Sequence, residues 1–164
     1  MIRAVYAFHK NGQLMFSKQF FREETLDKQH SPDLITGLLS AISQFAESMG
    51  GKGIQKIEME EKYSIIGIHS PKYSVRLVIL TDLGDDTGEC NYFLKRCRQS
   101  FVLKNRKALE KIRKGALVNT DHFLDWGENN LPRLMHDLEL MSIEEAMSGT
   151  IRKIAKLAKD KKEK

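Results

Sequence analysis

The first twenty-one residues, MIRAVYAFHKNGQLMFSKQFF (residues 1–21), decide how this chain folds. Two runs rich in β-branched and aromatic side chains, Ile2–Phe8 and Leu14–Phe21, flank the pair Asn11-Gly12. Asn-Gly accepts the positive φ angles of a tight type I′ turn, which joins antiparallel strands. The stretch therefore predicts a β-hairpin that begins at residue 2, with no leader segment in front of it.

A long amphipathic helix is predicted after the hairpin. Ser31-Pro32 supplies an N-cap followed by a proline at the first helical position, and Gly50-Gly51 supplies a C-terminal stop. The apolar side chains between these signals recur at helical spacing: Leu34, Leu38, Ile42, Phe45, Ala46 and Met49. We expect Leu38 and Ile42, in the middle of this stripe, to be buried against a sheet.

Three strands and a second helix are predicted next. The strands lie at residues 54–59, at Tyr63–His69 and at Tyr73–Leu80. The polar loop Asp82–Gly88 contains carboxylates that can cap a helix over residues 89–104. The apolar spacing of this helix can continue to Gly115. The order ββ-α-βββ-α predicts an α/β (α+β) sandwich, in which helices cover one five-stranded antiparallel sheet.

Only helices are predicted in the last third of the chain. Two short helices, one on each side of a break at Gly127–Asn130, precede a third that begins at the capping box Ser142–Glu145. We therefore expect a sheet domain at residues 1–105 and a C-terminal helical extension at residues 106–164, which ends in a basic amphipathic tail.

The element order and two segments of the sequence resemble those of longin domains. The resemblance implies a longin/profilin-like sandwich fold. The opening hairpin resembles the start of clathrin-adaptor sigma and mu subunits. The segment KYSIIGIH (residues 62–69), followed by a strand, resembles the central hairpin of longin domains such as that of the signal-recognition-particle receptor alpha subunit. The resemblance extends to about residue 105.

The resemblance implies a non-catalytic protein-interaction module, a scaffold or regulator for small GTPases or membrane-trafficking complexes. Its partner would be a small GTPase, a second longin- or roadblock-type subunit, or a second copy of this chain. The alternative from another class is a ligand-sensing regulatory domain of PAS or profilin-like type. A large pocket lined by polar groups would favour that alternative, whereas a filled core and a paired sheet edge would favour the scaffold.

The net charge of +5 is concentrated in blocks. Residues 95–114 contain nine basic and one acidic side chain, whereas residues 115–149 contain one basic and seven acidic side chains. The basic block predicts a partner-contact surface at Lys95, Arg96, Arg98 and Lys104. Its few aromatic residues make nucleic acid an unfavoured partner. The alternative is that the two blocks pair with each other.

The C-terminal helix predicted at Ile143–Ala158 has a basic polar face. Four side chains on that face are candidates for contact with an anionic membrane or an acidic partner: Arg152, Lys153, Lys156 and Lys159. Its apolar face lacks Trp and Phe anchors, so packing onto the domain or onto a partner helix is the alternative.

The sequence contains no pattern that predicts catalysis, a metal site or a cofactor. The five histidines are scattered, and the glycine-rich loop after the first helix lacks the complete phosphate-binding pattern. Cys90 and Cys97 lie two helical turns apart, too far for a disulfide, and are expected to be buried thiols. No apolar run approaches the roughly 20 residues of a membrane span. We expect a cytoplasmic protein, peripheral at most to a membrane surface.

Overall fold

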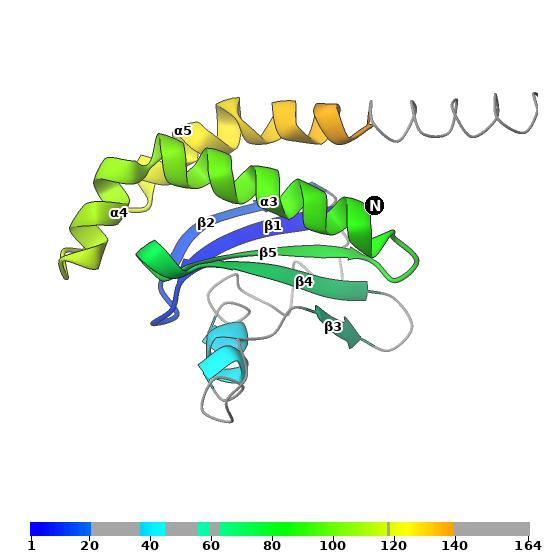
Figure 1. Cartoon of the computed structure of the whole chain (residues 1–164), viewed down its shortest axis with the longest axis horizontal. Coiled ribbons are helices and arrows are strands. Elements are labelled where there is room, and N and C mark those ends of the chain that lie inside the picture. The colour runs from blue at the N-terminus through cyan, green and yellow to red at the C-terminus, as the bar shows by residue number, and fades with distance from the viewer. Residues whose placement is uncertain (21–36, 45–55, 60–62, 118, 140–164) are drawn as a thin grey trace, which may run out of the picture.

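The computed structural model describes residues 1–20, 37–44, 56–59, 63–117 and 119–139 of the chain. The strands are β1 (Ile2–His9), β2 (Leu14–Gln19), β3 (Lys56–Met59), β4 (Tyr63–Ser70) and β5 (Val75–Asp82). They form one five-stranded antiparallel sheet in the order β2-β1-β5-β4-β3 (Figure 1). The predicted sheet and its element order are confirmed.

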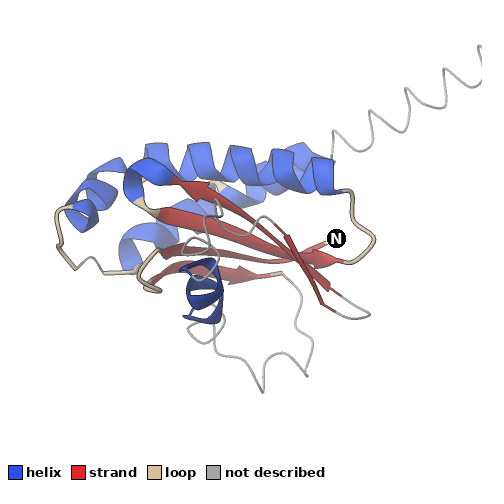
Figure 2. Ribbon diagram, turned by 60° about the horizontal axis from the view of Figure 1, so that its bottom comes forward, coloured by secondary structure: helices blue, strands red, loops and turns tan. Residues whose placement is uncertain are grey.

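Helices cover both faces of this sheet (Figure 2). One face carries α3 (Thr87–Lys104), α4 (Arg106–Arg113) and α5 (Asp121–Asn129), and a further helical stretch at residues 131–139 follows. The opposite face carries the helical residues 37–44. A short 3-10 helix, η1 (Pro71–Tyr73), joins β4 to β5. The predicted two-sided covering is therefore present.

The first hairpin forms with a wider turn than predicted. The Gly12 amide donates to the oxygen of His9 at 2.9 Å, and the His9 amide donates to the oxygen of Gln13 at 2.9 Å. Gly12 has a φ of 88°, but Asn11 does not have a positive φ. A type I′ turn needs positive φ at both central residues, so that prediction was wrong. The loop is instead a turn closed by a left-handed glycine.

The helix at residues 37–44 is rotated relative to the predicted stripe. Leu38 is 61% exposed and Ile42 is only partly buried, whereas Leu39, Ser40 and Ser43 face the sheet. The expected burial of Leu38 was wrong. The Ser40 hydroxyl donates to the backbone oxygen of Lys10 at 2.8 Å, and this bond to the first hairpin holds the rotated orientation.

The predicted continuous helix through Gly115 is interrupted at Asn105. The amide nitrogen of its buried side chain donates to the oxygen of Phe101 at 2.9 Å, and its backbone amide donates to the same oxygen at 3.0 Å. The chain then starts α4 as a separate helix. At the other end of α3, Asp86 accepts from the Glu89 amide at 2.9 Å, which confirms the predicted carboxylate cap.

The expected break at Gly127–Asn130 is helical up to Asn129, so that prediction was wrong. Gly127 is buried where α5 crosses β2, and a Cβ atom at this position would overlap the ring of Phe16. The glycine therefore permits close approach of helix and strand, at a cost in helix propensity of roughly 1 kcal/mol relative to Ala.

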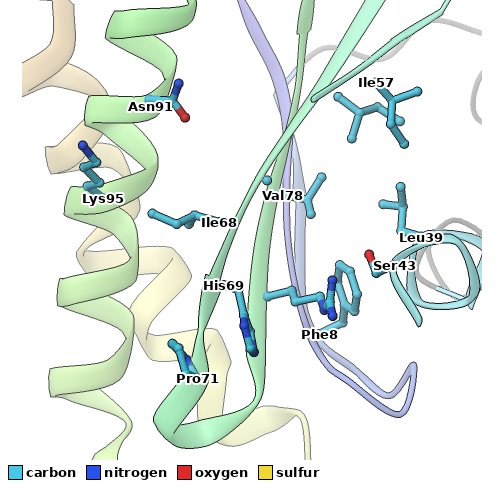
Figure 3. A pocket seen from close by; sticks show the side chains of 13 residues that line it. Phe8, Leu39, Ser43, Ile57, Ile68, His69, Pro71, Val78, Asn91 and Lys95 are labelled. Atoms are coloured by element: carbon cyan, nitrogen blue, oxygen red, sulfur yellow. The ribbon is translucent and has the colours of Figure 1, made fainter. Parts of the chain in front are cut away.

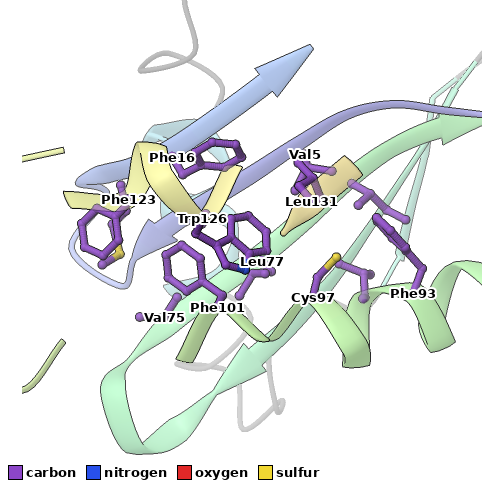
Figure 4. Packing of buried hydrophobic residues seen from close by; sticks show 14 of the residues in the cluster. Val5, Phe16, Val75, Leu77, Phe93, Cys97, Phe101, Phe123, Trp126 and Leu131 are labelled. Carbon is purple, nitrogen blue, oxygen red and sulfur yellow. The ribbon is translucent and has the colours of Figure 1, made fainter. Parts of the chain in front are cut away.

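An aromatic cluster forms the centre of the core on the α3 face (Figure 4). Trp126 makes edge-to-face contacts with Phe16 and Phe101 at centroid distances of 5.3 and 5.0 Å. Phe101 stacks on Phe123 at 5.4 Å. The Trp126 indole nitrogen donates to the Ser100 hydroxyl at 3.0 Å, so its one polar atom is satisfied.

Side chains beyond residue 105 belong to the same core as the sheet. Leu109, Ile112 and Leu131 are buried together with Phe123 and Trp126 in this cluster. Independent folding of residues 1–105 stays a prediction. Removal of residues 106–164 would expose the apolar side chains that α4 and α5 cover. We therefore expect the truncated domain to be less stable than the full chain.

Gly127→Ala is expected to destabilise the protein by about 1–3 kcal/mol, because the added methyl group overpacks the Phe16 contact. Urea denaturation measures the effect. Gly84→Ala is the matched control, since nothing lies within 4 Å of a Cβ atom there. Equal stability of the two variants would contradict the close packing of α5 on β2.

Trp126→Ala is expected to lower the free energy of unfolding by about 3–5 kcal/mol, because it removes the contacts with Phe16 and Phe101. Leu124→Ala, at a half-exposed position of the same helix, should stay within about 0.5 kcal/mol of the parent. If residues 106–164 were only attached to a self-sufficient sheet domain, unfolding of the sheet would be unchanged by either substitution.

Candidate functional site

Among the described residues, β3 pairs with only the first half of β4. β3 is short and pairs only with Tyr63–Ile66. The next four residues, Gly67–Ser70, pair with β5 on one side. On the other side, no strand within the described ranges pairs with them. An edge of this kind offers backbone amide and carbonyl groups to an incoming strand.

A cavity of about 490 Å³ lies along this edge (Figure 3). Leu39 and Ser43 of the helix at residues 37–44 stand on one side of β4, and Asn91 and Lys95 of α3 stand on the other. We call the cavity and the Gly67–Ser70 backbone together the edge groove. It is therefore built by elements that are far apart in the sequence.

Apolar side chains make up half of the groove lining. They come from the sheet face beneath residues 37–44, from that helix and from β4: Phe8, Leu39, Ile57, Ile65, Ile68 and Val78. Gly67, which has no side chain, lines the cavity in the middle of the strand. The lining thus combines apolar side chains with the partly buried backbone at Gly67.

The charged side chains of the groove are cationic. Lys95 is exposed at its rim, and Arg76 is buried in its wall on β5. None of the described lining residues carries a carboxylate. Arg98 of α3 lies at the same edge, where it donates to the backbone oxygen of His69 at 3.1 Å. The described charged side chains at this edge are therefore all cationic.

The four basic side chains predicted on α3 do not form one surface. Lys95 and Arg98 face β4, as described above. Arg96 makes an ion pair with Asp137 at 3.6 Å, and Lys104 makes one with Asp125 at 3.4 Å. Both acids belong to the acidic block of residues 115–149. These two ion pairs therefore agree with the alternative in which the basic and acidic blocks pair with each other. Partner contact by these basic residues stays a prediction.

The second predicted contact surface lies outside the described residues. It comprises Arg152, Lys153, Lys156 and Lys159. Their contact with a membrane or a partner also stays a prediction.

Cys90 and Cys97 are both buried and free, as expected. Burial raises the pKa of each thiol, so both stay protonated and unsuited to nucleophilic chemistry at neutral pH. Within the described ranges, His, Cys, Asp and Glu side chains nowhere gather in threes as a metal site would require. None of the helices described combines the length and apolar character of a membrane span.

The sequence contained one signal for the edge groove. Gly67 interrupts the β-branched run of β4, and glycine inside a strand often marks close approach by a ligand or another backbone. The other half of the signal, the early end of the pairing between β3 and β4, depends on register and was not visible in the sequence.

No protein-family model matches the sequence, and no curated protein matches it. Among solved structures, the mammalian SRP receptor is 12% identical with a TM-score of 0.53, over 87% of this chain and 98% of that one. A model of the AP-3 complex is 16% identical with a TM-score of 0.48, over 92% and 99%. Myxococcus xanthus MglB is 20% identical with a TM-score of 0.40, over 69% and 81%.

The likeness to the mammalian SRP receptor concerns the fold alone, because the sequences are only 12% identical. Together with the five-stranded antiparallel sheet and its two helical layers, it confirms the resemblance inferred from the sequence. The chain has a longin-like fold.

Proposed function

We propose that this protein is a non-catalytic interaction module that receives an extended segment of a protein partner in its edge groove. The observation that carries the proposal is the edge of β4 at Gly67–Ser70, along which no described strand pairs, beside a cavity of about 490 Å³. An added strand gains main-chain hydrogen bonds along such an edge, and pockets for its alternate side chains supply specificity.

The lining suggests the chemistry of the partner segment. Phe8, Leu39 and Val78 pack together in the groove lining, where an apolar side chain of the partner segment would contact them. Lys95 at the rim would favour a carboxylate one or two residues away. Arg98 covers part of the edge, because its side chain donates a hydrogen bond to the backbone oxygen of His69. A partner strand would have to displace this side chain or bind beside it.

The cellular setting we propose is a small-GTPase or membrane-trafficking complex, in the cytoplasm and peripheral to a membrane. The support is the longin resemblance of the sequence together with the longin-like fold. The partner would be a GTPase, a second longin- or roadblock-type subunit, or another copy of this chain. Light scattering of the purified protein, alone and with candidate GTPases, distinguishes these partners by mass.

A ligand-sensing domain is the second candidate function. The cavity volume lies within the 300–1,000 Å³ typical of small-molecule sites. Its lining also includes polar groups that can orient a ligand: Ser43, His69, Asn91 and Lys95. In that case the cavity would be filled without addition of a strand to β4.

Hydrogen exchange and a charge reversal test the proposal. Peptides selected from a library of extended sequences should slow exchange of outward-facing amides among Gly67–Ser70. Lys95→Glu should weaken the binding of these peptides about tenfold, because it replaces a rim charge that attracts a carboxylate with one that repels it. Lys18→Glu, at an exposed position on β2, is the control and should bind as the parent does.

Two outcomes would contradict strand addition. Selected peptides that protect amides elsewhere would move the binding site away from the groove. A metabolite that stabilises the protein and perturbs Leu39 and Asn91, without slowing exchange in Gly67–Ser70, would favour the ligand-sensing function.

A further inference from the structure

The outward face of α4 carries a concentration of positive charge outside the edge groove. Leu109 and Ile112 bury the inner face of this helix in the core. Lys107, Lys111 and Lys114 follow at i, i+4 and i+7, so they line the opposite face, and all three are exposed.

Among the described residues, these cations have no acidic partners. Glu110, the only acid in the stretch 106–114, pairs with Arg113 at 2.9 Å. Within the part of the chain that the structure describes, no carboxylate forms an ion pair with Arg106, Lys107, Lys111 or Lys114. We call these four residues the α4 basic face. It differs from the basic residues of α3, which face β4 or reach acidic side chains.

This arrangement disfavours the helix itself. Like charges at i and i+4, as at Lys107 and Lys111, repel each other along a helix. Their side chains also contribute nothing to the core, which Leu109 and Ile112 already anchor. An external anion would remove the repulsion.

Exposed leucines lie on both sides of the α4 basic face in the sequence. Leu103, three residues before the helix, is 79% exposed, and Leu117, four residues after it, is 91% exposed. Lys72 of η1, an element that contacts α4, adds an exposed cation nearby. Figure 1 places α4 at the end of the molecule opposite the N-terminus, where a flat surface can approach it.

Cations beside exposed aliphatic side chains fit a lipid surface better than a nucleic acid. Single-stranded nucleic acids are held by basic grooves with aromatic stacking platforms, and the stretch 103–117 contains no aromatic residue. Interfacial membrane sites combine Lys and Arg, which meet anionic headgroups, with apolar side chains that enter the headgroup boundary.

We propose that the α4 basic face, with Leu103 and Leu117, binds the surface of an anionic lipid membrane. Each basic residue near such a surface contributes roughly a factor of five in binding. Removal of three should therefore reduce membrane binding on the order of 100-fold. The attraction should weaken as salt rises, because charges are screened over about 8 Å at physiological ionic strength.

The test uses the full chain and vesicles of phosphatidylcholine, either pure or containing about one quarter phosphatidylserine. Cosedimentation at low and at physiological salt measures binding. The test variant is Lys107→Gln, Lys111→Gln and Lys114→Gln. The matched control, Lys10→Gln, Lys18→Gln and Arg133→Gln, removes the same charge from exposed positions elsewhere in the chain and should bind nearly as well as the parent.

A third variant separates α4 from the C-terminal tail. It replaces Arg152, Lys153, Lys156 and Lys159 with Gln and leaves the α4 basic face intact. We expect it to retain phosphatidylserine-dependent binding. A fourth variant, Leu103→Ser with Leu117→Ser, should lose part of the binding that survives at physiological salt. Circular dichroism confirms that each variant is folded.

Three results would overturn the proposal. One is equal binding of the parent to pure and to anionic vesicles. Another is equal loss of binding in the α4 variant and in the matched control, which would show a response to net charge alone. The third is tighter, α4-dependent binding to an RNA or DNA oligonucleotide than to anionic vesicles, which would assign the surface to nucleic acid.

Discussion

The contact between Trp126 and Phe16 is the interaction on which the rest of the structure depends. It joins α5 to the first hairpin, and Phe101 and Phe123 extend it to α3 and around the indole ring. Elements from the two ends of the described chain thereby share one core. The contact needs a glycine at position 127, because any larger residue would push the helix away from the strand.

The candidate site adjoins the opposite face of the sheet, next to the helical residues 37–44. Leu39 is the buried apolar side chain that the described residues 37–44 contribute, while Ser40 is held by the first hairpin through the oxygen of Lys10. β3 pairs along only half of β4. The edge groove lies where that pairing stops. The proposed binding function uses this edge of the sheet.

The basic side chains of α3 and of α4 have different surroundings. On α3, Arg96 and Lys104 reach acidic side chains of the last third of the chain, and Arg98 binds the β4 edge. The cations of α4 have no such role within the described structure. The edge groove and the α4 basic face therefore occupy different surfaces. The proposed strand addition and the proposed membrane binding therefore do not compete for the same residues.

Local patterns in the sequence were sufficient for the element order, the first hairpin, the Asp86 cap of α3 and the buried thiols. Each depends on neighbours within a few residues, whose spacing decides which side chains share a face. Only the tertiary structure decided what covers each face. It left Leu38 exposed, placed Gly127 inside a helix, ended the β3 pairing at Ile66 and gave the basic residues of α3 and α4 different surroundings. The periodicity of one segment contains no information about the partner segment. Rotation, register and ion pairing are set when both segments pack against the same sheet.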